Sequence, residues 1–348
     1  MRVLQILNSP DPGGVLALAN EIGSGLQQHG LKVETIFLAS RPDPSTLTKL
    51  WGAIKASRQL VLGGYDAVIA YQSGASITVG VAGLLAPRTQ RIVHQTVIPA
   101  ATAATARFLD RIAGSIGLYP TNVVNTVFTR DQFSGYPKAY RRRLLLIEHG
   151  VPQPLLRQSR AATLKQHNIP DDGRIILNTA RLVEQKNQEV IIRALASVPD
   201  ARLVIAGEGG LRSVYEHLAR SLGVGDRLHL LGALDHGDAL QLYGAADLFV
   251  FPSIHETFGI SAVEAVILGL PTVVSNTQVL REVLHIDGSS VVRFVPEDDV
   301  TAWTNAIQQF LDTPPQATLR ADFGERLAAK YSSERMLRSY LDLIRRGK

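Results

Sequence analysis

The stretch DLFVFPSIHETFGISAVEAVILGLPTVVS, residues 247–275, has the features of a strand, a loop, a helix and a second strand. LFVF is a short apolar run of the kind found in buried strands, and apolar residues follow at helical spacing from Ile260 onward. The tripeptide Gly269-Leu270-Pro271 combines the glycine and proline that commonly end a helix. Units in this order build parallel sheets covered by helices, so the stretch predicts an α/β fold. The helix residues that we expect to pack on the sheet are Ile260, Val263 and Ile267.

The same alternation of short β-branched runs and amphipathic stretches extends along the whole chain. The runs that we interpret as strands span 2–7, 33–38, 66–70, 91–94, 117–119, 175–179, 202–206, 228–231, 248–251 and 272–275. Residues 148–173 carry three prolines and no strand pattern, which indicates an interdomain link with a short helix.

These patterns predict two Rossmann-like parallel-sheet domains that face each other across a deep cleft. The expected domains are residues 1–155 and 156–330, and residues 331–348 are expected to form a C-terminal helix that packs back toward the first domain. Parallel sheets bind ligands beyond the carboxyl ends of their strands, so we expect the site in that cleft.

The composition of the 348-residue chain narrows the classes of protein to consider. The chain has no cysteine, which excludes disulfides, thiolate metal sites and a cysteine nucleophile. No signal peptide is recognised. The longest uncharged stretch, 67–87, is too polar for a membrane span and is better explained by a strand, a Ser/Gly turn and a buried helix.

Charge is distributed unevenly along the chain. The formal net charge is +5, and residues 1–150 contain 15 Lys and Arg against 8 Asp and Glu, whereas the remaining residues contain 21 against 23. The basic first part indicates either a solvated face or attraction to an anionic membrane surface or an acidic acceptor. Nucleic acid is not an expected partner, because no basic stretch is interleaved with stacking aromatic residues.

Two glutamates flank the start of the helix in the opening stretch. Glu256 falls in the loop after the strand, and Glu264 falls about one turn inside the helix. The free backbone amides between them, at a helix N-terminus, favour an anion such as a diphosphate. Each carboxylate could then bind hydroxyl groups at one end of a sugar nucleotide. From these residues alone, a loop charge and a half-exposed helix residue are equally acceptable interpretations.

A cationic cluster and a glycine pair add to this pattern. LNTARLVEQKN, residues 177–187, follows a predicted strand and supplies Arg181 and Lys186, which could neutralise a diphosphate without a metal ion. Gly13-Gly14 lies between the first strand and a helix predicted over 15–29, where glycines allow a ligand to approach the backbone closely. Surface cations and an ordinary turn are the alternative interpretations.

Other catalytic signatures are absent or incomplete. AGEGGLR, residues 206–212, lacks the third glycine of a dinucleotide fingerprint. His255-Glu256 begins like a zinc-protease helix, but Gly259 stands where the second histidine would be. The sequence contains no G-x-S-x-G elbow, no phosphate-binding G-x-x-x-x-G-K-[ST] loop and no D-x-D pair, and acidic residues 297–299 fit N-capping better than metal ligation. We therefore expect no metal ion and no cofactor.

Taken together, these segments resemble the retaining glycosyltransferases of family 4, which have the GT-B fold. ADLFVFPSIHETFGISAVEAVILGLPTVVSN resembles the family's E-x7-E segment, TARLVEQKN its G-R-L-x-x-x-K-G segment, and LVIAGEGG its next glycine turn. PGGVLALANEIGSGLQQHGLKV resembles its N-terminal glycine-loop helix. Two departures are Asn187, where the family has glycine, and His149-Gly150-Val151-Pro152, where its link often reads N-G-V-D.

The resemblance assigns roles to individual residues. It implies catalytic roles for His94, Arg181, Lys186 and Glu256, of which the two cations would hold the diphosphate. It implies that Glu264 binds the ribose diol. The remaining substrate-binding residues that it implies are Gly13, Gly14, Gly209, Phe258, Gly259 and Ile260. Without the resemblance, a histidine at a strand end is more often structural.

The activity implied is metal-independent transfer of a hexosyl unit, with retention, from a UDP- or GDP-linked sugar to a glycan or lipid-linked saccharide in polysaccharide biosynthesis. The expected location is cytoplasmic, with the basic first domain peripheral on the inner face of the cell membrane. Three alternatives stay open at this point: a glycosidase, a sugar-nucleotide 2-epimerase of the same fold, and a catalytically silent partner subunit. The sequence identifies neither the base, the hexose nor the acceptor.

Overall fold

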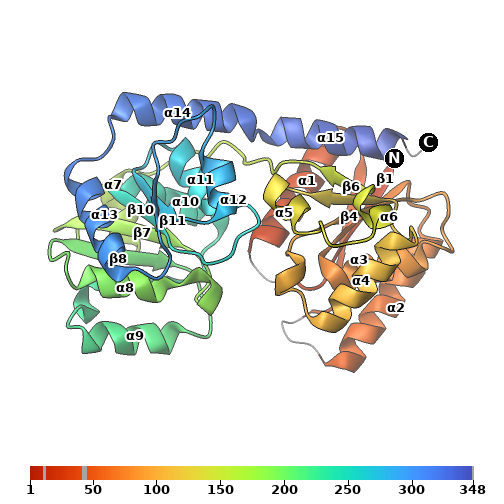
Figure 1. Ribbon diagram of the computed structural model, residues 1–348, viewed down its shortest axis with the longest axis horizontal. Helices are drawn as coiled ribbons and strands as arrows, with labels where there is room; N and C mark the ends of the chain where they lie inside the picture. The colour runs from red at the N-terminus through yellow and green to blue at the C-terminus, as the bar shows by residue number, and fades with distance from the viewer. Residues whose placement is uncertain (11–12, 41–44, 347–348) are drawn as a thin grey trace. The chain divides into compact units, whose positions relative to one another are not determined.

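The computed structural model, shown in Figure 1, describes residues 1–10, 13–40 and 45–346. The chain forms two compact units. The first contains Met1–Pro152 and Tyr331–Lys348, and the second contains Gln153–Lys330. Each unit is built on one six-stranded parallel sheet, as the alternating pattern of the sequence predicts.

The sheet of the first unit has the strand order β2-β1-β3-β4-β5-β6. Its strands are β1 (Arg2–Leu7), β2 (Lys32–Phe37), β3 (Ala67–Tyr71), β4 (Gln90–His94), β5 (Thr121–Val124) and β6 (Leu144–Leu146). Its helices are α1 (Gly14–Gln28), α2 (Thr46–Leu62), α3 (Gln72–Ala82), α4 (Ala104–Ser115), α5 (Val127–Asp131), α6 (Lys138–Arg141) and α15 (Ser333–Arg346). One 3₁₀ turn, η1 (Pro99–Ala101), precedes α4.

Alternate residues of these strands face two different helical layers. Val3 and Leu7 of β1 pack with residues of α1 and α15, whereas Leu4 and Ile6 pack with residues of α2, α3 and α4. The period of two places successive side chains on opposite faces, and both faces are apolar because both are covered. The helices α2, α3 and α4 therefore form one layer, with their other sides turned away from the sheet.

The sheet of the second unit has the order β12-β11-β10-β7-β8-β9. Its strands are β7 (Arg174–Thr179), β8 (Ala201–Ala206), β9 (Leu228–Gly232), β10 (Leu248–Phe251), β11 (Thr272–Ser275) and β12 (Arg293–Val295). Its helices are α7 (Arg160–Gln166), α8 (Gln188–Leu195), α9 (Arg212–Ser221), α10 (His236–Ala245), α11 (Ile260–Ile267), α12 (Gln278–Leu284), α13 (Val300–Asp312) and α14 (Ala317–Lys330). Two 3₁₀ turns, η2 (Glu184–Lys186) and η3 (Gly225–Arg227), interrupt its loops.

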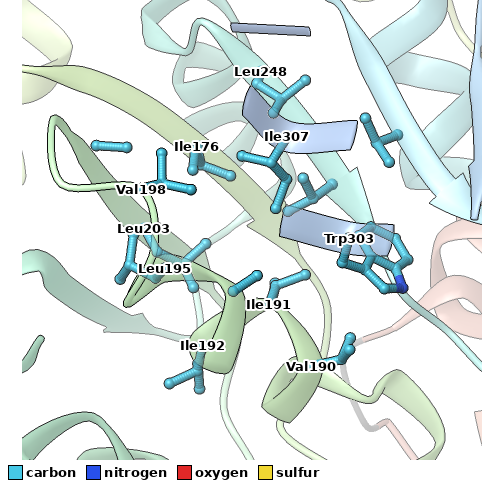
Figure 2. Packing of buried hydrophobic residues seen from close by; sticks show 14 of the residues in the cluster. Ile176, Val190, Ile191, Ile192, Leu195, Val198, Leu203, Leu248, Trp303 and Ile307 are labelled. Carbon is cyan, nitrogen blue, oxygen red and sulfur yellow. The ribbon is translucent and has the colours of Figure 1, made fainter. Parts of the chain in front are cut away.

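One core cluster of the second unit lies between a face of its sheet and the helices α8, α9 and α13, and Figure 2 shows part of it. Trp303 of α13 is fully buried there, and its indole nitrogen donates a hydrogen bond to the Pro296 carbonyl at 2.9 Å. Each large side chain buried in this way contributes roughly 1.5–3 kcal/mol of transfer free energy. The loops at the ends of these strands are thus attached to a closely packed support.

Two sequence predictions about elements are wrong. Residues 117–119 form no strand, because Gly117 has φ +85° and the Leu118 amide donates to the Ala113 carbonyl, which closes the end of α4. In addition, no Ser/Gly turn separates β3 from α3, since the helix begins at Gln72, directly after the strand.

The orientation of α11 also differs from expectation. Val263 is fully buried, but Ile260 and Ile267 are only half-buried. The helix packs against α14 as well as against β10 and β11. Its buried apolar residues are therefore the small ones, alanines and valines, which allow these elements to approach closely. In the described part of the chain, no helix is long and apolar enough to cross a membrane.

Candidate functional site

The second sheet has a topological switch point between β7 and β10. From β7 the chain proceeds through β8 to β9 on one side, and β10 through β12 lie on the other side. The two strands pair in parallel, with Leu177 opposite Phe249. The loops that leave them, 180–187 and 252–259, therefore start side by side at one edge of the sheet. Such an edge is where open parallel sheets bind ligands.

These two loops bring Lys186 and Glu256 into an ion pair. The Lys186 ammonium donates to a Glu256 carboxylate oxygen and lies 5.2 Å from the centre of the Phe251 ring. Both side chains are largely buried, at 15% and 11% exposure. The sequence places these residues 70 positions apart, and the fold makes them partners.

Gln185 fixes the relative position of the two loops. Its carbonyl accepts a hydrogen bond from the Ile254 amide at 2.9 Å, and its side-chain amide donates to the His255 carbonyl at 2.6 Å. Glu256 follows immediately in that loop. The sequence analysis missed this role, because a glutamine in a polar loop carries no distinctive signal.

Arg181, the other predicted cation, is exposed. None of the ion pairs or hydrogen bonds found among the described residues involves its guanidinium. The loop that carries it is held by its backbone, since the Leu182 amide donates to the Glu208 carbonyl at 3.0 Å. An exposed, unpaired guanidinium with five donors is well suited to bind an anion.

Asn187 follows Lys186 at the position where the family pattern has glycine. It has φ 50° and ψ 36°, the left-handed conformation that glycine adopts easily and asparagine tolerates better than most residues. Its side-chain amide also donates to the Glu297 carbonyl at 2.7 Å. Asparagine therefore provides the same turn as glycine and adds a hydrogen bond.

The N-terminus of α11 presents unpaired backbone donors. Gly259 precedes the helix with φ 91°, and its carbonyl accepts from the amides of Ala262 and Val263. The amides of Ile260 and Ser261 come before the first helical hydrogen bond and have no intrahelical acceptor. Phe258, which is 2% exposed, anchors the turn in the core.

Gly259 itself is fixed by geometry. A Cβ atom at this position would lie 2.8 Å from a Leu280 methyl group, in addition to the unfavourable positive φ. Both effects restrict the position to glycine.

Glu264 is buried one turn inside α11 and has two partners from α10. Its carboxylate accepts from the His236 ring at 2.6 Å, and its other oxygen lies 3.4 Å from the Tyr243 hydroxyl. That hydroxyl also lies 2.7 Å from the Thr179 hydroxyl at the end of β7. Burial and the nearby carboxylate raise the pKa of Tyr243 well above its usual value, so the phenol stays protonated. Glu264 is 4% exposed, which rejects the interpretation as a half-exposed helix residue.

Gly209 lies beside the loop that carries Arg181, and close packing there leaves no room for a side chain. A Cβ atom there would lie 2.3 Å from the Leu182 carbonyl oxygen. The glycine turn after β8 therefore supports the loop after β7, which is a structural reason for the residue.

The first unit has its own pocket at the carboxyl edge of its sheet, which the sequence analysis did not identify. Its volume is about 230 Å³. The lining residues are Asn8, Gln72, Ser73, Gln95, Thr96, Val97, Ala101, Thr102, Ala103 and Ala106. Asn8, Gln72 and Gln95 follow β1, β3 and β4, so the pocket lies at the switch point of this sheet between β1 and β3. None of these lining residues, all from the described part of the chain, is charged.

The polar side chains of this pocket are held in place by local bonds. The backbone N–H of Asn8 donates to the side-chain oxygen of Gln72 at 3.2 Å. The side-chain oxygen of Asn8 accepts from the backbone N–H of Ala75 at 3.0 Å. Gln72 has φ 71°, an unfavourable angle for a residue with a side chain. Neutral amides and hydroxyls suit the hydroxyl groups of a saccharide.

His94 ends β4 but is 1% exposed. Its Nδ1 atom lies 2.6 Å from the Tyr340 hydroxyl of α15, and its ring stacks between Tyr71 and His149. Its Nε2 atom is buried without a partner among the described residues. Burial, followed by the neighbouring His149, lowers the pKa of His94 well below its usual value, which keeps the ring neutral. His94 is not among the residues that line the pocket.

The glycine pair at the start of α1 is exposed. Gly13 has φ 154° and ψ −179° and caps the helix, its carbonyl accepting from the Ala17 amide at 3.0 Å. A Cβ atom at Gly13 would touch nothing within 4 Å, so only the backbone angle requires glycine. Gly14 is the first residue of the helix.

The described residues contain no group of three or more His, Asp or Glu side chains that could hold a metal ion. Asp299, in the acidic run 297–299, instead caps α13 by accepting from the Ala302 amide at 2.9 Å.

The second unit is similar in sequence to a known protein family. Residues 159–329 match the family model of glycosyl transferases group 1. An uncharacterized glycosyltransferase of Methanocaldococcus jannaschii is 37% identical over 138 residues, which cover 39% of this chain and 35% of that protein. The GDP-mannose-dependent alpha-(1-6)-phosphatidylinositol dimannoside mannosyltransferase of Mycobacterium tuberculosis is 30% identical over 207 residues, 56% of this chain and 50% of that protein. The chain thus aligns with half or less of the length of these relatives.

A solved structure extends the likeness over both units. The Anabaena protein HepE, in complex with UDP and glucose, has a TM-score of 0.82 and 20% identity, covering 98% of each chain. This likeness shows the fold, two Rossmann-like parallel-sheet units of the GT-B type. The matched segment 159–329 contains every residue of the second-unit site described above.

Proposed function

We propose that the chain is a retaining glycosyltransferase that moves a hexosyl unit from a UDP- or GDP-linked sugar to a glycan or lipid-linked saccharide, without a metal ion. The observation that carries the proposal is the edge between β7 and β10. There Lys186, Glu256 and the first amides of α11 lie on adjacent loops of a segment with a glycosyltransferase pattern.

The diphosphate of the donor would bind to Arg181, Lys186 and the α11 amides. Arg181 has no competing partner among the described residues, whereas Lys186 is held ready by Glu256. Backbone amides at a helix start complement negative charge without a metal ion. Each of these donors gains strength as charge develops on the departing diphosphate, and loss of one such donor typically costs ~3–4 kcal/mol of transition-state stabilisation.

The two carboxylates would bind the two ends of the donor. Glu264, oriented by His236 and Tyr243, is suited to accept hydrogen bonds from a ribose diol. Glu256 would accept from hydroxyls of the hexose while it keeps Lys186 in position. The relative known from Mycobacterium tuberculosis is named for GDP-mannose, and HepE binds UDP, so both bases are retained in the proposal.

The group transfer balances without a further reagent. The bond from the anomeric carbon to the diphosphate oxygen breaks, and a bond from the acceptor hydroxyl oxygen to the same face of that carbon forms. The acceptor proton passes to the departing diphosphate oxygen. The neutral pocket of the first unit, with Asn8, Gln72 and Gln95, is the proposed acceptor site because its amides match saccharide hydroxyls.

The test is a screen of UDP-, GDP- and ADP-sugars by thermal shift, followed by turnover with and without saccharide acceptors. A donor at 100 times its Kd should stabilise the protein by ~2.7 kcal/mol, and UDP- or GDP-sugars should do so in the presence of EDTA. Product should appear only with an acceptor and should keep the anomeric configuration of the donor. Stabilisation by no nucleotide sugar, or turnover of the donor to an epimer without acceptor, would reject the proposal.

A further inference from the structure

We propose that the outer side of the α2–α3–α4 layer is a docking surface for an anionic lipid bilayer. This inference rests on the first unit alone and does not depend on the activity proposed above. The three helices lie side by side in Figure 1, with α3 in contact with both α2 and α4.

The surface carries many large apolar side chains that the described part of the chain leaves exposed. We call these residues the apolar patch: Leu47, Leu50, Trp51, Ile54, Val81, Leu84, Leu85, Phe108, Leu109, Ile112 and Ile116. Trp51 is 70% exposed, Leu85 75% and Phe108 62%. Single exposed apolar residues are common, but their concentration on adjacent helices marks an interaction site.

The apolar residues follow the helical repeat. Phe108 and Ile112 of α4 and its C-cap residue Ile116 follow one another at intervals of four residues. On α2, Leu47, Trp51 and Ile54 share one side. These residues therefore project from the side of each helix opposite to its sheet contacts. Helices with one apolar and one basic side lie in the membrane interface with the apolar side inserted.

The exposed charged side chains of α2 and α4 are all positive, and the nearby carboxylate of Glu34, on β2, accepts hydrogen bonds from Gln59 of α2 and from Tyr65. Lys49, Lys55 and Arg58 on α2 and Arg107 and Arg111 on α4 are exposed. None of the ion pairs found among the described residues involves them. Between residues 45 and 117 the sequence has only two acidic residues, Asp66 and Asp110.

Asp110 is removed from this surface by the fold. It is 5% exposed, and its carboxylate accepts a hydrogen bond from the Tyr140 hydroxyl at 2.7 Å and one from Gln95 at 3.3 Å. Tyr119 donates to its backbone carbonyl at 2.7 Å. The only acid of α4 is thus held in the core, so the exposed side of the helix carries arginines without a compensating charge.

This charge pattern distinguishes a bilayer from a second copy of the chain. In a symmetric dimer the same patch would face itself, and five uncompensated cations on each side would repel one another. Anionic headgroups neutralise those cations, while the acyl region accepts the apolar side chains. The bilayer is therefore the occupant that matches both features.

The position of α4 connects the surface to the pocket. Ala103 and Ala106 line the pocket, and Phe108 and Ile112 belong to the next turn of the same helix. A saccharide carried on a membrane lipid would therefore meet the pocket close to the bilayer. This last step, unlike the docking itself, rests on the proposed transferase function.

The docking can be tested with the chain's own tryptophans. The chain has two, Trp51 in the patch and Trp303 buried in the second unit. We expect vesicles of phosphatidylcholine with 30% phosphatidylglycerol to shift the emission to shorter wavelength and brominated lipids to quench it, and Trp51→Phe to abolish both changes. Quenching that persists in Trp51→Phe, or no binding to the anionic vesicles in low salt, would overturn the proposal.

Substitutions separate the contribution of the basic residues to vesicle binding from that of the apolar residues. Each basic residue near an anionic surface strengthens binding roughly fivefold, so Arg107→Gln with Arg111→Gln should weaken vesicle binding roughly 25-fold. The double lysine variant should restore it, and 0.5 M salt should abolish binding of the intact protein. Phe108→Glu should release the protein, whereas Leu319→Glu, at an exposed apolar residue of α14, should not.

Sedimentation velocity without lipid decides between the occupants. A monomer is expected, and a dimer that Phe108→Glu dissociates would assign the patch to a second copy instead. Thermal stabilisation by nucleotide sugars, measured in the absence of vesicles, reports on the second unit separately. If the intact protein binds nucleotide sugars but does not bind anionic vesicles, the docking surface is rejected and the transferase proposal stays in place.

Discussion

The two units have the same kind of sheet, but the residues at their switch points differ in charge. Each has a six-stranded parallel sheet with a switch point, between β1 and β3 in the first unit and between β7 and β10 in the second. At the first lies a pocket whose described lining residues carry neutral amides, hydroxyls and small apolar groups. At the second lie an ion pair, the exposed guanidinium of Arg181 and the start of a helix. Sheet topology therefore decides where the loops at the carboxyl edge meet, and the residues of those loops decide which charges are found there.

The largest expected effect concerns the charged switch point. Under the proposed function, replacing the exposed Arg181 with alanine should lower kcat roughly 10²–10³-fold with little change in folding stability, because its guanidinium would stabilise the additional charge on the departing diphosphate. Steady-state kinetics with a nucleotide sugar would measure this. Arg193→Ala is the matched control, since Arg193 is an exposed arginine of α8 paired with Glu189. An Arg181→Ala enzyme with near-normal kcat would remove the distinction between the two switch points.

The next effect concerns the buried carboxylate of the same site. Glu264→Gln keeps the size of the side chain but loses the charge that accepts from His236. Hydrogen bonds to a charged group contribute ~1.5–3 kcal/mol, so we expect nucleotide affinity to fall roughly tenfold to 150-fold. Calorimetry with the free nucleoside diphosphate would measure the change. Equal losses for a nucleoside diphosphate and for pyrophosphate would show that Glu264 does not contact the ribose.

In the first unit, the buried His149, which stacks on His94, predicts a pH effect on stability rather than on ligand binding. Burial lowers the pKa of His149 from 6.5 to about 4, so the folded protein keeps this ring neutral while the unfolded chain takes up a proton. Stability is therefore unaffected above pH 6.5 and is lost as pH falls from about 6.5 toward 4, by about 3 kcal/mol for this group.

Denaturant unfolding of the whole chain at several pH values would measure this loss. His149→Asn should flatten the acid slope, whereas His217→Asn, at an exposed histidine of α9, should leave it unchanged. An unchanged slope in His149→Asn would mean that other groups cause the acid sensitivity.

Local sequence patterns anticipate the switch-point loops but not the partners that complete them. Arg181, Lys186 and Glu256 could be identified because each follows a clear apolar strand. His236 and Tyr243 could not, because they reach Glu264 from 28 and 21 residues earlier in the chain, on a helix with no functional signature. Such contacts depend on packing between elements.

Three strands were not predicted. Strand β5 (Thr121–Val124) lies just after residues 117–119, where a strand was predicted instead. Strands β6 (Leu144–Leu146) and β12 (Arg293–Val295) have three residues each and are too short to show a period of two. Strands β6 and β12 pair in parallel with the neighbouring strands β5 and β11, whose backbone groups complete their hydrogen bonds. The pocket of the first unit was missed because Asn8, Gln72 and Gln95 are neutral residues that come together only at the sheet edge.

The smallest expected effect tests how the charged loop keeps its shape. Asn187 stands in a left-handed turn where glycine is the easier residue, and its side chain donates to the Glu297 carbonyl. Asn187→Gly loses the hydrogen bond but relieves the backbone, so we expect stability within about 1 kcal/mol of the original. Asn187→Ala loses the bond and keeps the strain, and should cost about 1–2 kcal/mol more than glycine. Urea unfolding of the two variants measures the difference. An alanine variant as stable as the glycine variant would mean that the loop can change conformation, and kcat should then fall as well, because Lys186 is the preceding residue.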